Sequence, residues 1–275
     1  MNRFESQLPL TEPAFSALVR NIPLQDSPPL PPDWLRVEML ERYQILRQVR
    51  VDAGSTVLEV GSGPHAIATV PLAFVVGSAG SVLAAEPSRW SRFPAIVAAS
   101  GMTNRIHPVR CDARHLPFES SSVDLSACLH GIRSMGDPEN LVAIVREMLR
   151  VTPRAILAET LPVTQNDAQR AHQAMYDLRH EVFEMAFGRQ DDLPYPSMDT
   201  LATLVERAGG TVEVSRTLEM DLPHALAHFP RALIEEVPDA VAGESLLRRW
   251  DEADALAQRF GTDHPPVAIV IAARA

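Results

Sequence analysis

The stretch LEVGSGPHAIA, residues 58–68, joins an apolar strand-like segment to a helix-like segment through a pair of glycines. Because Gly61 and Gly63 lack side chains, the backbone there can approach a ligand closely, and unpaired N–H groups at the start of a following helix can bind polar or anionic groups. Turns of this kind bind NAD, FAD, nucleotides and sulfonium cofactors alike. The turn alone therefore does not identify the ligand, and the neighbouring segments of the sequence are needed to do so.

Short apolar segments alternate with helical ones on both sides of this turn. Asp33 is placed to cap a helix through residues 34–49, whose apolar residues recur at helical spacing. Beyond it the pattern predicts strands at 56–60, 81–86, 105–112, 123–130 and 154–160, and helices at 65–76, 88–100 and 138–151. Such alternation is typical of a parallel sheet with helices on both faces. The sequence therefore predicts an α/β fold with a doubly wound, mostly parallel sheet.

The C-terminal half adds longer helical segments to this pattern. We expect helices at 165–187 and 198–209, a strand at 211–220, further helices within 222–261 and a last strand at 266–275. No linker separates a second domain, so residues 33–275 are expected to form a single domain with helical insertions at about 165–209 and 222–261. Residues 1–32 are rich in proline and are expected to form an irregular arm.

Composition narrows the classes of partner. The formal net charge is −10, from 25 basic and 35 acidic residues, and a surface of this charge repels nucleic acid and anionic lipid. We therefore expect a small-molecule partner, with no nucleic acid and no membrane. The first residues lack the apolar core of a signal peptide, so a cytoplasmic protein is expected. All basic residues are arginine, which excludes a lysine nucleophile.

The two cysteines carry no recognisable chemistry. Cys111 and Cys128 fall within predicted strands, and their spacing fits neither a disulfide framework nor a zinc site. We expect both to be small buried core residues.

Two acids stand at the ends of successive predicted strands. Glu86 closes the second strand, where a carboxylate can accept hydrogen bonds from both hydroxyls of a ribose. Asp112 closes the third strand, where an acid can accept a bond from an exocyclic amine. With the fourth strand, the segments LEVGSGP, AAEPS, CDARHLPF and VDLSACLHGI resemble the class I S-adenosylmethionine-dependent methyltransferases over roughly residues 50–160. The resemblance implies a Rossmann-like fold with an antiparallel last strand, and S-adenosylmethionine as cofactor.

The same resemblance implies roles for individual residues around the first two strands. Glu59, Gly61 and Gly63 would surround the methionine end of the cofactor. Glu86 would hold the ribose hydroxyls, and Pro87 would flank the adenine.

Further roles follow at the third and fourth strands. Asp112 would bind the adenine amine, and the N–H of Ala113 would reach a ring nitrogen. Leu129 and His130 would line the cleft near the departing methyl group. His130 is our expected catalytic residue, as a general base, although a structural or cofactor-shielding histidine is an equally open alternative.

His65 departs from the pattern of the family, which commonly has glycine or another small residue at this position. Pro64 suits the first position of a helix, so the turn can still form. A protonated His65 could pair with the methionine carboxylate. The alternative is a side chain that faces solvent or the sheet edge.

The helix expected at 165–187 carries two faces. Its core stripe is expected to consist of Ala171, Met175, Leu178 and Val182. A neighbouring face carries His172, Tyr176 and His180 at four-residue steps, and it is expected to be either a substrate-facing lid or exposed to solvent.

That neighbouring face bears on metal and substrate binding. Two histidines two turns apart are too far from each other to bind one ion without a third ligand between them, so no metal site is expected. We assign Tyr43, His172, Tyr176 and Tyr195 to substrate binding, because all lie in segments that such folds use to cover the active site.

These observations favour methyl transfer to a small-molecule acceptor. Members of the family that methylate amide or nucleobase amines often carry an Asn-Pro-Pro-Tyr-like run after the fourth strand, and CLHGI is unlike it. Two alternatives stay open: a non-catalytic or repurposed cofactor-binding member of the same fold, and a dinucleotide-dependent oxidoreductase. The amphipathic segment 248–260 is expected to be a surface helix or the contact of a homodimer.

Overall fold

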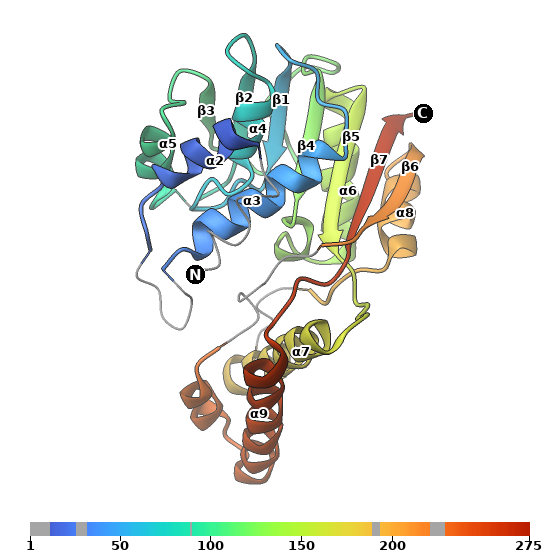
Figure 1. The fold of residues 1–275 in the computed structure, drawn as a ribbon. Helices are drawn as coiled ribbons and strands as arrows, with labels where there is room; N and C mark the ends of the chain where they lie inside the picture. Colours follow the sequence, from blue (N-terminus) through green and yellow to red (C-terminus); the bar gives the residue numbers. More distant parts are fainter. Residues whose placement is uncertain (1–11, 26–31, 89, 189–192, 221–228) are drawn as a thin grey trace.

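The computed structural model of the protein describes residues 12–25, 32–88, 90–188, 193–220 and 229–275 (Figure 1). One sheet forms its centre. Its strands are β1 (Thr56–Val60), β2 (Ser81–Ala85), β3 (Ile106–Val109), β4 (Leu125–Leu129), β5 (Arg154–Thr160), β6 (Gly210–Leu218) and β7 (Val267–Arg274). The spatial order is β3-β2-β1-β4-β5-β7-β6. The first five strands are parallel, and β7 pairs antiparallel with both β5 and β6. The predicted fold class is confirmed.

Helices cover both faces of this sheet. Apolar side chains of four helices pack with the strands into one core on the first face: α2 (Pro13–Arg20), α3 (Trp34–Arg47), α4 (Thr69–Val75) and α5 (Phe93–Ser100). Two helices form a second core on the opposite face: α6 (Pro138–Val151) and α8 (Met198–Arg207). Among the described helices, none is both long and apolar enough to cross a membrane.

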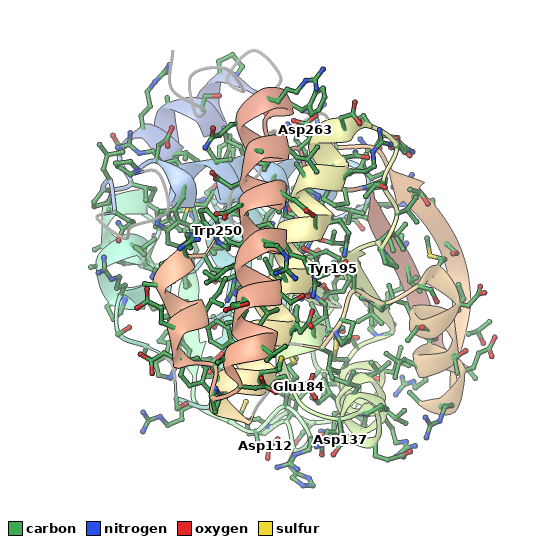
Figure 2. The ribbon with its side chains drawn as sticks, turned by 90° about the horizontal axis from the view of Figure 1, so that it is seen from below. Asp112, Asp137, Glu184, Tyr195, Trp250 and Asp263 are labelled. Carbon is green, nitrogen blue, oxygen red and sulfur yellow. The ribbon has the colours of Figure 1, made fainter. Side chains whose placement is uncertain are left out.

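A helical cap lies below the sheet, on the side where its parallel strands end (Figure 1). It consists of α7 (Asp167–Phe187), the short 3₁₀ segment η3 (Arg231–Glu236) and α9 (Ala240–Phe260), and it has an apolar core of its own. Seen from below, α9 and α7 lie over the end of the sheet (Figure 2). The core stripe predicted on α7 is confirmed, since Ala171, Met175, Leu178 and Val182 are all buried.

Local chemistry explains where several elements begin. Asp137 caps α6 by accepting a hydrogen bond from the N–H of Asn140 at 2.9 Å. Asn166 caps α7 in the same way, by accepting a hydrogen bond from the N–H of Gln169 at 2.8 Å. Asp33 holds the position before α3, as predicted, but its side chain makes no cap hydrogen bond. The predicted helices at 34–49 and 138–151 and the strands at 56–60 and 154–160 are therefore confirmed to within two residues.

Three predictions in the N-terminal half are wrong. The first is the arm, which contains the helix α2, while residues 1–11 and 26–31 lie outside the described residues. The second is the helix expected to start at residue 65, because α4 begins at Thr69. Pro71 lacks an N–H and is tolerated only in the first turn of a helix, so it delays that start. His65 therefore lies in the loop, and Pro64 does not begin a helix.

The third wrong prediction concerns Cys111. The edge strand β3 ends at Val109, so Cys111 lies beyond it, half-buried, instead of in the core. Pro108 can form no hydrogen bond through its nitrogen, which restricts it to an edge strand such as this one. Cys128 is buried in β4 as expected.

Candidate functional site

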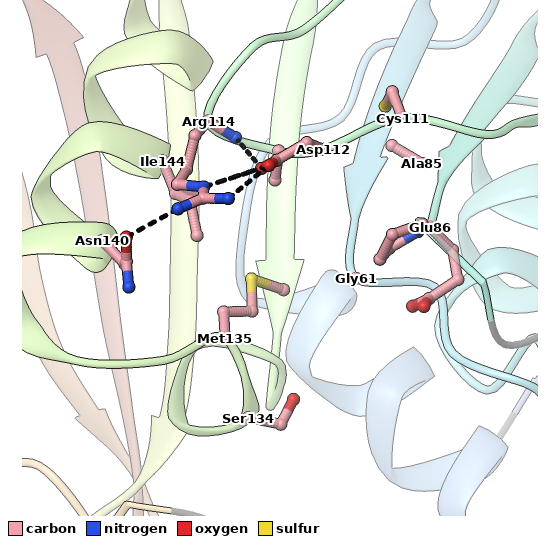
Figure 3. A pocket seen from close by; sticks show the side chains of 12 residues that line it. Gly61, Ala85, Glu86, Cys111, Asp112, Arg114, Ser134, Met135, Asn140 and Ile144 are labelled. Carbon is pink, nitrogen blue, oxygen red and sulfur yellow. Dashed lines mark hydrogen bonds and ion pairs between the residues drawn. The ribbon is translucent and has the colours of Figure 1, made fainter.

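Two adjoining cavities open at the carboxyl ends of the parallel strands. The first measures about 390 Å³ and is lined by Gly61, Ala85, Glu86, Pro87, Cys111, Asp112, Ala113, Arg114, Ser134, Met135, Asn140 and Ile144 (Figure 3). The second measures about 140 Å³ and is lined by Arg42, Glu59, Gly61, Ser62, Gly63, Pro64, His65, Ile67, Ala68, Leu129, His130, Gly131 and Ser134. They share Gly61 and Ser134. All ten residues that the sequence assigns to the cofactor or to catalysis line one cavity or the other.

The glycine turn is shaped by its backbone. Gly61 has φ +81° and Gly63 has φ +62°, the left-handed region that favours glycine. The N–H of Gly61 donates to the carbonyl of Ala85 at 3.0 Å, which ties the turn to the end of β2. A Cβ atom on Gly61 would lie 2.0 Å from the Cε of Met135, so this side chain occupies the space that the glycine leaves.

Glu86 lies beside the glycine turn at the edge of the first cavity (Figure 3). Its side chain is buried, and its carboxylate accepts hydrogen bonds from the N–H of Gly63 at 3.3 Å and the N–H of Ser88 at 3.4 Å. An ionised carboxylate offers about four acceptor positions. Both of these bonds come from backbone N–H groups, and Glu86 lines the first cavity, where the hydroxyls of a bound ribose would reach it.

Asp112 lies at the exposed rim of the first cavity and is engaged by Arg114 (Figure 3). Its oxygens accept bonds from the Arg114 backbone N–H at 2.9 Å and from Nη2 of the guanidinium at 2.6 Å. These hydrogen bonds lower the pKa of Asp112 to about 2, so the carboxylate is ionised at neutral pH. Arg114 also donates to Asn140 at 3.1 Å. An amine that binds Asp112 has to share it with Arg114.

Glu59 and Ser62 are the buried polar groups of the second cavity. Glu59 accepts a hydrogen bond from the hydroxyl of Thr69, and burial, together with the charge of Glu86, raises its pKa to about 7. Within the described part of the chain, the buried hydroxyl of Ser62 has no hydrogen-bond partner. Carboxylates at Glu86 and Asp112, an open glycine turn and an unsatisfied hydroxyl form a donor and acceptor set that fits a nucleoside joined to an amino acid.

His65 lines the second cavity, and its ring packs edge-on against Trp34 with centroids 5.2 Å apart. Burial lowers the pKa of His65, and the charge of Arg92 lowers it further. The imidazole is therefore neutral near pH 7, which argues against a cationic partner for a carboxylate.

His130 follows β4 in a strained backbone conformation, with φ +56°. Its imidazole is 6% exposed and lies 3.2 Å from Thr160 Oγ1 through Nδ1 and 3.2 Å from Glu41 Oε1 through Nε2. Burial, followed by the charge of Arg42, holds the pKa of His130 well below its ordinary value. His130 is thus a neutral imidazole at the wall of the second cavity.

Glu41 and His264 complete this wall, although the sequence analysis did not single out either residue. Nε2 of His264 lies 3.2 Å from the same Glu41 oxygen, and both side chains are buried. Burial would raise the pKa of Glu41, but Arg42 and His264 outweigh it and lower that pKa well below its ordinary value. Burial would lower the pKa of His264, but the Glu41 carboxylate outweighs it and raises that pKa.

The four residues assigned to substrate binding line neither cavity. Tyr43 lies in the core, where its ring stacks on Phe15 at 4.2 Å and its hydroxyl donates to Glu12 at 2.7 Å. Tyr176 and Tyr195 stack on each other at 3.8 Å, and His172 lies 3.0 Å from the Tyr195 hydroxyl.

These three residues belong to the inner side of the cap. On the predicted helix face, His172 and Tyr176 are buried and His180 is half-buried, so the alternative of a solvent-exposed face is wrong. The guanidinium of Arg133 lies 4.7 Å from the ring centre of Tyr195, and the ring of His172 lies 6.4 Å from that of His264. Tyr176, Tyr195 and His172 thus connect the cap to the wall formed by Glu41, His130 and His264.

Similar proteins agree with this arrangement. No protein-family model matches the chain. A cyclopropane-fatty-acyl-phospholipid synthase-like protein from Lactobacillus casei superimposes with a TM-score of 0.73 over 96% of this chain and 100% of its own, at 17% identity. An S-adenosylmethionine-dependent methyltransferase from Methanosarcina mazei superimposes with a TM-score of 0.50 over 84% of this chain and 96% of its own, at 15% identity. The chain has the class I methyltransferase fold.

A sequence relative extends this result beyond the fold. The demethylmenaquinone methyltransferase of Staphylococcus haemolyticus is 28% identical over 180 residues, which cover 61% of this chain and 73% of the relative. The family resemblance of the sequence is therefore supported by both kinds of comparison.

The buried Glu59 makes stability depend on pH. Between its ordinary value of 4.5 and its raised value of about 7, the folded chain retains a proton that the unfolded chain has lost. The free energy of unfolding therefore falls by about 3 kcal/mol as the pH rises through this range. Glu59→Gln has no such proton to lose. Urea denaturation across this range measures the effect. As the pH rises, the free energy of unfolding of the variant should increase by about 3 kcal/mol relative to that of the wild type.

The exposed Glu206 provides the control for this experiment. Glu206→Gln should follow the wild type at every pH, since its carboxylate lies at the surface of α8. A constant difference between Glu59→Gln and the wild type would show that Glu59 is ionised in the folded protein throughout.

Proposed function

We propose that this protein transfers the methyl group of S-adenosylmethionine to a small-molecule acceptor held between the sheet and the helical cap. The observation that carries the proposal is the convergence of all ten predicted cofactor and catalytic residues on two adjoining cavities. Glu86 follows β2 and Asp112 follows β3, and both line one cavity beside Gly61, with the Asp112 carboxylate turned toward Arg114 (Figure 3). This juxtaposition is the one that an adenosine requires.

Each residue group has a distinct task in this proposal. The cofactor supplies an electrophilic methyl group on a sulfonium. Glu86 binds the ribose hydroxyls, and Asp112 holds the adenine amine at the rim. The glycine turn, Ser62 and Glu59 hold the amino-acid end in the second cavity. The chain thereby fixes the direction of transfer, and a displacement reaction needs mainly such positioning.

The acceptor side is formed by His130 and the cap. His130 is neutral because of its lowered pKa, so a ring nitrogen has a lone pair available for a proton or for a metal ion. The net charge of −10 disfavours nucleic acid as a substrate. Demethylmenaquinone, named in the relative, is likewise a small molecule.

Calorimetry with purified protein tests cofactor binding. We expect S-adenosylmethionine to bind, and Glu86→Gln to weaken binding about tenfold to a hundredfold, since hydrogen bonds to a charged group contribute about 1.5–3 kcal/mol. Glu206→Gln should bind as the wild type does. Tight NAD binding together with no S-adenosylmethionine binding would instead support a dinucleotide-dependent oxidoreductase.

His65 is expected to contribute little to the affinity for the cofactor. Because its pKa is lowered and its ring packs on Trp34, His65→Ala should change the dissociation constant by less than about threefold, while the lost ring contact lowers stability by about 1 kcal/mol. Calorimetry at several pH values and urea denaturation measure the two effects. A large loss of affinity that grows as the pH falls below 6.5 would establish the cationic role instead.

The class of acceptor is accessible through labelled methyl groups. We expect purified protein, incubated with methyl-labelled S-adenosylmethionine and a cell extract, to transfer label to material that passes a small-molecule filter. Heat-inactivated protein is the control. Label retained on protein or nucleic acid would contradict the small-molecule acceptor, and label transferred to nothing, with cofactor binding intact, would favour a non-catalytic member of the fold.

A further inference from the structure

Three donor atoms from distant parts of the chain converge on one point. They are Oε1 of Glu41 on α3, Nε2 of His130 after β4 and Nε2 of His264 before β7. Each histidine nitrogen lies 3.2 Å from the carboxylate oxygen, and all three atoms lie within 4.8 Å of one another. Ligand bonds of about 2.0–2.2 Å place the donor atoms of one metal ion roughly 3–4 Å apart. The two nitrogen–oxygen separations therefore match a common ion.

The other nitrogen of each imidazole is already engaged. Nδ1 of His264 is hydrogen-bonded to the carbonyl of Pro265, which can only accept, so Nδ1 carries the proton. Nδ1 of His130 lies 3.2 Å from Thr160 Oγ1 and 3.9 Å from Glu159 Oε2. Histidine ligands of metals usually donate their second N–H to a carbonyl or carboxylate in this way. The arrangement directs both Nε2 atoms at the Glu41 oxygen.

Glu41 Oε1 lies 3.2 Å from two imidazole nitrogens, and a buried carboxylate oxygen in this position attracts positive charge, carried either by a proton on an imidazole or by a metal ion. Further charged groups surround this point. Arg42 pairs with Glu38 at 3.2 Å as well as with Glu41, and Arg133 pairs with Glu159 at 3.2 Å. The described side chains around this point thus include three carboxylates and two guanidinium groups. Arg42 contacts the same Oε1 of Glu41 as the two histidines, and an ionised carboxylate oxygen has two lone pairs, so that it can accept from the guanidinium and bind an ion together.

We propose that Glu41, His130 and His264 bind a divalent transition-metal ion. Two imidazoles and one carboxylate form a donor set of intermediate softness, which suits Zn²⁺, Fe²⁺, Co²⁺ or Ni²⁺ better than Mg²⁺ or Ca²⁺. Three protein ligands leave at least one coordination position open, as in catalytic metal sites. His172 and His180, whose spacing drew attention to metal binding in the sequence, are not members of this set.

The position of the site links it to the acceptor. His130 also lines the second cavity, so the ion lies at the border of the space in which a methyl acceptor would bind. A hydroxyl or carboxylate oxygen of the acceptor can fill the open coordination position. This consequence rests on the proposed methyl transfer, whereas metal binding itself does not.

Cobalt is a suitable probe because its visible absorption reports its ligands. Untagged full-length protein, stripped of metal with a chelator, is titrated with Co²⁺ without any cofactor. We expect one ion per chain and a spectrum of nitrogen and oxygen ligation, without the thiolate band that Cys111 or Cys128 would produce. Zn²⁺ should displace Co²⁺ and raise the melting temperature, since a ligand that binds only the folded state stabilises it.

Variants identify the ligands. Glu41→Gln and His264→Gln should each weaken Co²⁺ binding by at least about a hundredfold, because even the loss of an outer partner of a metal ligand costs up to about that much. His172→Gln is the matched control: it replaces an equally buried histidine outside the set and should bind Co²⁺ as the wild type does. Melting curves and circular dichroism confirm that each variant is folded.

The outcomes separate this proposal from the proposed function. No binding of Co²⁺ or Zn²⁺ to the wild type at about 100 μM, a thiolate spectrum, or equal binding by folded Glu41→Gln and the wild type would each overturn the metal site. If the variants do not fold, the stoichiometry and spectrum of the wild type decide alone. S-adenosylmethionine binding is measured separately on the metal-free protein, so its failure counts against methyl transfer and leaves the metal site standing.

Discussion

Buried negative charge at the carboxyl ends of the strands constrains this molecule more than any other feature. Five glutamates lie there with at most 2% exposure: Glu38, Glu41, Glu59, Glu86 and Glu159. A buried charge is costly unless it is paired and hydrogen-bonded. The chain meets this requirement with two arginines, with a proton retained on Glu59 and with backbone N–H groups. A packed core of apolar residues would avoid the cost altogether, so the arrangement points to ligands that need these charges.

Parallel topology accounts for how much of the site the sequence could predict. Residues that end successive parallel strands must meet at one edge of the sheet, so Glu59, Glu86 and Asp112 could be placed together from strand order alone. The glycine turn indicated the same location of the site from a short stretch of sequence. Those parts of the site depend on backbone placement, which follows from periodicity in the sequence.

The remainder depends on tertiary packing, which leaves no local pattern. Glu41 and Arg42 lie on α3 between the apolar positions from which the helix was predicted, yet α3 is buried along most of its length, and Glu41 contacts His130 and His264. His264 precedes the last strand, and only the antiparallel insertion of β7 beside β5 brings it next to His130. Tyr195 was assigned to substrate binding, but its ring stacks on Tyr176 of α7. Each case joins segments that are far apart in the chain.

The carboxylates beside the glycine turn also distinguish between the two classes of cofactor that such turns bind, dinucleotides and S-adenosylmethionine. A dinucleotide would bring a doubly charged pyrophosphate to this turn, beside Glu59 and Glu86, and the turn offers it little compensation. His65 is neutral, and α4 begins only at Thr69, so no helix N-terminus lies directly behind the glycines. S-adenosylmethionine brings a sulfonium and an ammonium group instead, and positive charge would favour the ionised form of Glu59. The same surplus of carboxylate draws a divalent cation toward Glu41. The carboxylates of Glu86 and Asp112 thus favour a cationic ligand over a pyrophosphate at the first cavity, and the glycine turn is suited to close approach of the backbone rather than to phosphate binding.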